Sequence, residues 1–281
     1  MEPVLITDGS GRTVRWRRDA PLAPQDVRWR VVLSGWRRIL LGVRYWESSP
    51  PAELRGFVSC LWGHGTAPVE GSQLVVPDGC VDLIWRAGRV EAAGPDTGAW
   101  VSGLDAGAPI FGIRARPGMA RLLLGVPAAE LQDLRVDATE IWGSRGRDLA
   151  DAVDEHPELA PALLERFARE RLAEWEPDPA VAVAVAALDD RRPPSVRALA
   201  GRIGVSERQL RRRIGDAVGY GPQTLVSVLR FQRAVRSGGE HQLADLSHRC
   251  GYADQAHLSR EFRRLSGLTP KRYFARDQAA S

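Results

Sequence analysis

The sequence predicts an α+β protein, in which a β-rich N-terminal domain with trailing helices is followed by an all-α domain. Between residues 45 and 116, short apolar or alternating runs are interrupted about every eight to twelve residues by Gly, Pro or Asp, which is typical of hairpin-connected strands. After Pro117 the apolar residues recur at three- and four-residue intervals, which indicates helices. At 281 residues, the chain is long enough for about two domains, taking roughly 150 residues per domain.

Charge divides the chain in the same way. Residues 45–179 contain 12 Lys and Arg against 22 Asp and Glu, whereas residues 180–281 contain 18 against 9. The acidic, proline-punctuated stretch at 174–179 is the best linker candidate. We therefore expect an extension at 1–43, poorly ordered or foreign to the native protein, a mixed domain at 44–176 and a basic domain at 180–281 that faces a polyanion.

Several protein classes are disfavoured. The longest apolar run, Pro179 to Leu188, is shorter than the roughly 20 residues that span a bilayer, and the N-terminus has no secretory signal pattern. The cysteines Cys60, Cys80 and Cys250 form neither a CxxC pair nor a disulfide framework, which favours a reducing cytoplasm. We expect a cytoplasmic protein without a membrane partner.

Two similar segments lie in the basic domain, VRALAGRIGVSERQLRRRIG from residue 196 and LADLSHRCGYADQAHLSREFRRLSG from residue 243. Each has a small residue, Ala200 or Ser247, followed four positions later by Gly204 or Gly251. A second helix then follows with an apolar anchor, and the second copy has one more residue before that anchor. Because glycine makes a tight left-handed turn cheaply, the pattern predicts two helix-turn-helix units.

The stretch GYADQAHLSREFRRLSGLTPKRYF, residues 251–274, closely resembles the C-terminal signature of the AraC-type (AraC/XylS) transcriptional regulators, and the resemblance covers about residues 180–281. It implies a seven-helix DNA-binding domain of a bacterial transcription factor, with recognition helices near 206–217 and 254–265. Both helices would enter the major groove on one side of double-stranded DNA, about 34 Å apart, so the site would be asymmetric.

The side chains that face the bases can be inferred from the anchors Leu210 and Leu258. Positions two before, one after and two after each anchor point away from the core, and the family's base-contacting positions fall on the same places. These positions, with Gln255 beside them, are Arg208, Arg211, Arg212, Ala256, Ser259 and Arg260. Arginine pairs with guanine, glutamine pairs with adenine, and Ala256 offers only apolar contact. Phosphate contacts are expected from Arg213, Arg263, Arg264 and Lys271.

Residues 44–150 more loosely resemble the N-terminal module of a poorly characterised subset of these regulators, which implies ligand sensing or subunit pairing. In Pro77-Asp78-Gly79-Cys80, a turn is favoured over a ligand contact. Arg114 and Arg116 would share one strand face and offer a place for an anion. The tryptophans Trp62, Trp85, Trp100 and Trp142 either line an apolar pocket or fill the core.

Catalysis has little support, because the chain lacks a GxSxG motif, a P-loop and a GxGxxG after a strand. His64 and Cys80 alone do not make a metal site. We therefore expect no enzyme, no catalytic residue, no cofactor and no metal. A small-molecule effector, RNA polymerase and a second copy of the chain remain open as partners. The alternative is an effector-independent DNA-binding protein whose N-terminal domain serves only protein contacts.

Overall fold

The computed structural model describes residues 4–7, 13–16, 39–40, 43–65, 71–104, 108–238 and 242–279. Most of the extension expected at 1–43 lies outside these residues. Within it the structure describes three short strands, namely β1 (Val4–Thr7), β2 (Thr13–Trp16) and β3 (Ile39–Leu40). β1 pairs with β2 as a separate antiparallel ribbon.

The N-terminal domain is built on an antiparallel sheet with the strand order β11-β8-β7-β10-β5-β4-β3. A separate two-stranded ribbon pairs β6 with β9. The strands are β4 (Val43–Ser48), β5 (Val58–His64), β6 (Gly71–Val75), β7 (Val81–Arg86), β8 (Arg89–Ala93), β9 (Trp100–Leu104), β10 (Ile110–Ala115) and β11 (Arg135–Asp137). The expected β-rich domain with trailing helices is confirmed.

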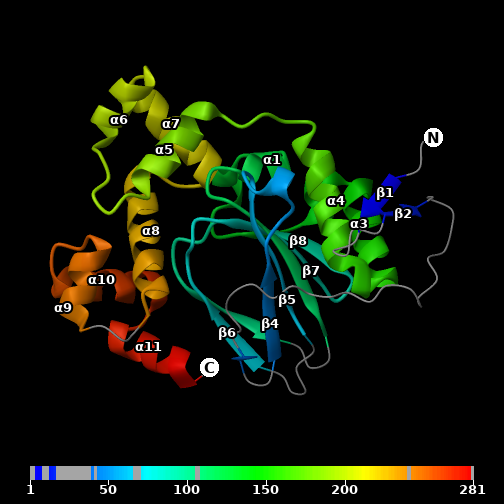
Figure 1. Ribbon diagram of the computed structural model, residues 1–281, viewed down its shortest axis with the longest axis horizontal. Helices are drawn as coiled ribbons and strands as arrows, with labels where there is room; N and C mark the ends of the chain where they lie inside the picture. Colours follow the sequence, from blue (N-terminus) through cyan, green and yellow to red (C-terminus); the bar gives the residue numbers. More distant parts are fainter. Residues whose placement is uncertain are drawn as a thin grey trace.

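One face of the large sheet packs against helices. Along β7, Val81, Leu83 and Trp85 are buried in a core that also contains Leu164 and Phe167 of the trailing helices. Because successive strand residues point to opposite faces, this alternation gives the sheet one face for the helical core. The trailing helices are α1 (Ala120–Leu124), α2 (Ala138–Trp142), α3 (Ser144–Glu155) and α4 (Ala160–Leu172). Figure 1 shows α3 and α4 beside the β7–β8 end of the sheet.

The other face of the sheet has a small core of its own. It buries Trp62 and Ile84, whereas Trp85 lies in the core against the helices. Arg86 crosses from β7 to the ribbon, where its Nη2 donates to Ser102 Oγ at 3.0 Å. The tryptophans therefore do not line one common pocket, because strand alternation sends Trp62 and Trp85 to opposite faces.

The C-terminal domain contains seven helices within the described residues, as expected. They are α5 (Pro179–Leu188), α6 (Val196–Ile203), α7 (Glu207–Val218), α8 (Pro222–Arg236), α9 (Leu243–Cys250), α10 (Gln255–Ser266) and α11 (Pro270–Ala279). One continuous core joins them, with Leu210 and Leu258 fully buried in it. The aromatic rings of Phe231 and Phe262 meet edge to face in this core, with centroids 4.8 Å apart.

The two domains touch. Leu74 of β6 and the nearby Val76 pack against the core of the C-terminal domain. The end of α7 lies beside a short 3₁₀ turn, Ala128–Leu131, of the N-terminal domain. Figure 1 shows α8 running down the side of the molecule that carries β6, with α9 and α10 farther from the sheet. No helix of the described residues is long and apolar enough to cross a membrane.

Candidate nucleic-acid interface

The first helical pair, α6 and α7, is defined by its caps. Ser195 begins α6 by accepting the Ala198 N–H at 3.2 Å, and Gly204 ends the helix in a left-handed conformation, with φ of 80°. Ser206 then begins α7 with a reciprocal capping box, in which Gln209 also bonds the Ser206 backbone. Such side chains satisfy N–H groups that have no partner inside the helix. The turn residues predicted from the sequence therefore lie where the structure needs them.

The second pair, α9 and α10, repeats this construction. Gly251 ends α9 with φ of 82°. Asp254 begins α10 by accepting the His257 N–H at 2.6 Å. The small residues Ala200 and Ser247, at equivalent places in the two units, are both buried. The two-unit organisation predicted from the repeat is thus present, including the longer turn of the second unit.

Most of the side chains predicted to face the bases are exposed. On α7 these are Arg208, Arg211 and Arg212, and on α10 they are Gln255, Ala256 and Arg260; Ser259 is half-buried. The predicted phosphate contacts Arg263, Arg264 and Lys271 are also exposed. Because the anchors occupy the core, each second helix presents a polar, mainly basic face to solvent.

Two of these exposed arginines are engaged in ion pairs. Arg211 pairs with Glu207 at 2.6 Å and Arg264 with Glu261 at 3.0 Å. Burial opposes ionisation of Glu261, but hydrogen bonds from Arg264 and Ser227 hold the pKa of its carboxyl below its ordinary value. An exposed pair such as Arg211–Glu207 contributes about 0–1 kcal/mol, so an acceptor on DNA can replace the Glu207 carboxylate at little cost.

Arg213 differs from the other predicted phosphate contacts. It is half-buried and pairs at 3.5 Å with Asp178, the residue that caps α5. The sequence pattern did not reveal this partner, because Asp178 lies 35 positions earlier in the predicted linker. Contact with a phosphate would require Arg213 to leave Asp178.

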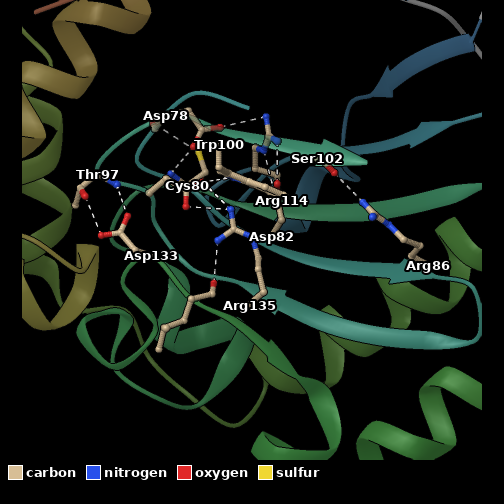
Figure 2. Close-up of polar contacts among 12 residues, drawn as sticks. Asp78, Cys80, Asp82, Arg86, Thr97, Trp100, Ser102, Arg114, Asp133 and Arg135 are labelled. Carbon is tan, nitrogen blue, oxygen red and sulfur yellow. Dashed lines mark hydrogen bonds and ion pairs between the residues drawn. The ribbon is translucent and has the colours of Figure 1, made fainter. Parts of the chain in front are cut away.

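A polar cluster that the sequence did not reveal lies on the sheet face opposite the trailing helices. Arg114 of β10 donates to both carboxylate oxygens of Asp82, from Nε at 2.9 Å and from Nη2 at 2.8 Å. Its Nη1 lies 3.2 Å from Asp78 Oδ2. Figure 2 shows Arg114 together with Asp78, Cys80 and Asp82. One guanidinium thus connects two neighbouring carboxylates.

This cluster corrects the expectation of an anion site at Arg114 and Arg116. Arg114 is already paired with two carboxylates, and Arg116 lies beyond the end of β10, where its Nε donates to the Arg55 carbonyl at 2.8 Å. Burial raises the pKa of Asp82, while the positive charge of Arg114 opposes that shift. The two arginines therefore do not form a joint anion site.

The turn Pro77–Cys80 connects this cluster to the C-terminal domain. The Asp78 carboxylate accepts the Cys80 N–H at 2.8 Å, and Gly79 has φ of 82°, so the predicted turn is confirmed. The Pro77 carbonyl accepts a hydrogen bond from Gln232 Nε2 of α8 at 2.6 Å. A Cβ at Gly79 would lie 3.4 Å from the Tyr220 hydroxyl. Sequence spacing carries no signal for this contact, since Gln232 is 155 residues from Pro77.

A second polar network supports the neighbouring loop. Asp133, with φ of 57°, accepts the backbone N–H of Thr97 at 2.7 Å and its hydroxyl at 2.8 Å. Arg135 pairs with Asp96 at 2.8 Å. Figure 2 shows Thr97 and Asp133 at the left and Arg135 nearer the centre. Pro95 in this loop lies against Gly219 at the end of α7. A Cβ on Gly219 would lie 2.3 Å from the proline ring.

The His, Cys, Asp and Glu side chains that the structure describes do not gather into a metal centre. Among the described residues, no group of three His, Cys, Asp or Glu side chains is placed to hold a metal ion. His64 is buried beside Tyr45, with ring centroids 4.9 Å apart. Burial, followed by the charge of Arg86, lowers the pKa of His64 to about 4.

Two family models match separate parts of the chain. A model described as a helix-turn-helix domain matches residues 199–276, and a model of a domain of unknown function (DUF6597) matches residues 47–137. A curated protein of Streptomyces lividans, described as an AraC-like transcription regulator, is 35% identical over 100 residues. That match covers 34% of this chain and 33% of the relative, so the chain spans about a third of the relative's length.

Similar experimental structures include the DNA-binding domain of AdpA in complex with a target DNA, at 28% identity and a TM-score of 0.34, covering 36% of this chain and 95% of that one. An AraC-type regulator from Chromobacterium violaceum is 25% identical at a TM-score of 0.34, covering 37% and 96%. ToxT from Vibrio cholerae O395 is 11% identical at a TM-score of 0.40, covering 83% and 96%.

These TM-scores are all below 0.5, so the three structures add nothing to what the sequence comparisons show. The matched model begins within α6 and ends within α11, and so includes both units. Residues 199–276 therefore match a helix-turn-helix family model, and over 100 residues the chain is similar to a protein described as an AraC-like transcription regulator.

Proposed function

We propose that the chain is a sequence-specific DNA-binding transcriptional regulator, which reads the major groove with α7 and α10. The observation that carries this proposal is the pair of capped helices whose anchors are buried while their basic faces stay exposed. A protein that regulates transcription by binding DNA in this way would work in the bacterial cytoplasm.

Specific roles follow for the exposed side chains. Arg208, Arg211 and Arg212 of α7 and Arg260 of α10 would contact guanines, with Gln255 toward an adenine. Ala256 and Ser259 lie between Gln255 and Arg260 on α10 and would complete this base-facing surface. Arg263, Arg264 and Lys271 would hold phosphates, together with Arg213 once it leaves Asp178.

The N-terminal domain, residues 44–176, would regulate the C-terminal domain, residues 180–281, by binding a small-molecule effector or by pairing subunits. Support comes from the contact of the Pro77–Cys80 turn with α8, since this turn is tied to the sheet through Arg114. A conformational change in the sheet would therefore be transmitted through this turn to α8, the helix that joins the two helix-turn-helix units. A homodimer and RNA polymerase are further partners within this proposal.

The test is fluorescence-anisotropy binding of the full chain to DNA from upstream of its own gene and to scrambled DNA at several salt concentrations. Arg260→Ala and Arg212→Ala should each reduce the preference for the native fragment by about 1–3 kcal/mol, because each loses a bidentate pair with a base.

Arg147→Ala is the matched control, because Arg147 is an exposed arginine on α3, away from both units. It should bind like the wild type. Equal preference in wild type and both test variants would exclude base recognition by these arginines. Failure of the wild type to bind any duplex at low salt would overturn the proposed function.

A further inference from the structure

Arg233 lies in the last turn of α8, where it contacts two other helices at once. Its Nη1 donates to the Cys250 carbonyl at 3.2 Å, and its Nη2 donates to the Asp189 carbonyl. The same Nη2 lies 3.0 Å from the Asp189 carboxylate, and the Arg233 side chain is only 22% exposed. Neither partner is near Arg233 in sequence, as they lie 44 and 17 positions away.

Both carbonyls are at helix C-termini. Asp189 is the residue that ends α5, and Cys250 is the last residue of α9. The last carbonyls of a helix have no partner inside it and carry the negative end of the helix dipole. A guanidinium suits this place because its charge is permanent and its donors form a rigid fork that reaches two acceptors. Arg233 thus joins the C-terminal ends of two helices.

The same region brings two backbone segments together. Gly251, the turn residue of the second unit, lies so close to the chain before α6 that a Cβ would be 2.4 Å from the Arg191 carbonyl oxygen. Gly251 also has φ of 82°, which a side chain would strain. The turn of the second unit is therefore seated on the loop that leads into the first unit, immediately beside the Arg233 contacts.

These contacts change how the two units are connected. α8 contacts α7 in the first unit and α9 and α10 in the second, and one apolar core continues through all seven helices. α5 packs with α7 and so belongs to the first unit, whereas α9 belongs to the second. The bridge from α5 through Arg233 to α9 adds a polar connection to this apolar core, and the added connection restricts the angle between α7 and α10 further than packing alone.

We infer that Arg233 is a positioning residue that determines which spacing between the two halves of a DNA site the protein accepts. This inference rests on the proposed function, because it requires α7 and α10 to read the same duplex. One additional base pair between the halves moves the second half by about 3.4 Å and turns it by roughly 34°. With the Arg233 bridge in place, α10 cannot move with the displaced half-site. Either the DNA must then deform, or one of the two units must lose its contacts with the bases.

The experiment begins with full-length wild-type protein and a library of random duplexes, from which a bound two-part site is selected. Duplexes are then made with one or two base pairs inserted or deleted between the halves, and their Kd values are measured by anisotropy. Arg233→Ala and Arg233→Lys are compared with the wild type, since a lysine keeps the charge but cannot reach two carbonyls in a fork.

The wild type should lose about tenfold or more in affinity for each one-base-pair change in spacing. Both Arg233 variants should bind the selected spacing more weakly and lose less than about threefold on changing it. Arg236→Ala is the control, because it removes the same charge from the same helix at an exposed residue that bonds no other described residue. It should keep the wild-type dependence on spacing.

Asp189→Ala provides a second variant if the Arg233 variants fail to fold, because it leaves the guanidinium on both backbone carbonyls and removes only the carboxylate. The affinity of Asp189→Ala should depend on spacing less than that of the wild type but more than that of the Arg233 variants. An unchanged dependence in every folded variant, or a wild type that tolerates all spacings equally, would overturn the inference. A wild type that selects no site from the library would overturn the proposed function as well, which separates the two failures.

Discussion

At the scale of single residues, the N-terminal domain contains charges whose cost of burial is offset by pairing. Arg114 connects Asp82 with Asp78, and Arg135 connects Asp96 with the ring of Trp100, 4.3 Å away. These side chains are 12–28% exposed, so removing one partner should cost less than the about 3–5 kcal/mol that is typical of a fully buried pair. His64 is different, because it is buried in the neutral form and its Nδ1 has no hydrogen-bond partner among the described residues.

His64 should make the protein less stable as the pH falls. Its pKa is about 4 in the folded protein, against 6.5 for an ordinary histidine, so the unfolded chain binds a proton that the folded chain does not. The free energy of unfolding should therefore fall between about pH 6.5 and pH 4, by up to about 3 kcal/mol. Urea unfolding at pH 7 and pH 5 measures this loss.

His64→Gln should lessen the difference between the two pH values, because glutamine does not titrate. His156→Gln, which changes a more exposed histidine at the end of α3, should leave the difference as it is in the wild type. The same pH dependence in both variants would show that His64 does not cause it.

At the scale of elements, the stability of α7 depends on its first residues. Ser206→Ala removes the oxygen that accepts the Gln209 N–H and leaves half of the capping box. The expected loss is about 1 kcal/mol, measured as a lower Tm or a lower urea midpoint. Ser144→Ala is the matched control, since Ser144 is exposed in the first turn of α3 and its hydroxyl bonds no described residue. Equal losses in the two variants would contradict a special role for the cap.

The helical elements were predictable because their signals are local. Ser206 and Gln209 lie three positions apart, and Gly204 and Gly251 end the helices on which they are found. A cap acts through the backbone of its own turn, so the printed sequence contains all the participants. The exposure of the arginines was predictable for the same reason, since they lie on the same helices as the buried anchors and at positions that point away from them.

At the scale of the whole molecule, a hydrogen bond between Gln232 of α8 and the Pro77 carbonyl couples the two domains. Gln232→Ala would remove the hydrogen bond from α8 to the Pro77 carbonyl, which should weaken the domain contact by about 1 kcal/mol. Hydrogen exchange should then be faster at the amides of residues 78–80, because that turn would lose its hydrogen bond to α8. Gln223→Ala, at an exposed position of the same helix, should leave the exchange unchanged. Unchanged exchange in Gln232→Ala would contradict coupling through this bond.

Contacts at this scale could not be predicted from the sequence. Arg114 and Asp82 are 32 positions apart, and Gln232 and Pro77 are 155 apart, so no periodicity joins them. Sequence pattern placed Arg114 on a strand but could not show which strand lies next to it. For the same reason, it predicted a turn at Asp78 without indicating that the turn touches α8.

The apolar contribution of Leu74 and Val76 to the C-terminal core bears on how this protein can be divided for expression. The exposed segment before Pro179 is the obvious place to cut the gene. A fragment that begins at Pro179 would nevertheless expose to solvent the apolar surface against which Leu74 and Val76 pack. Such a fragment should be less soluble than the intact chain, and placing polar residues on that surface should restore its solubility.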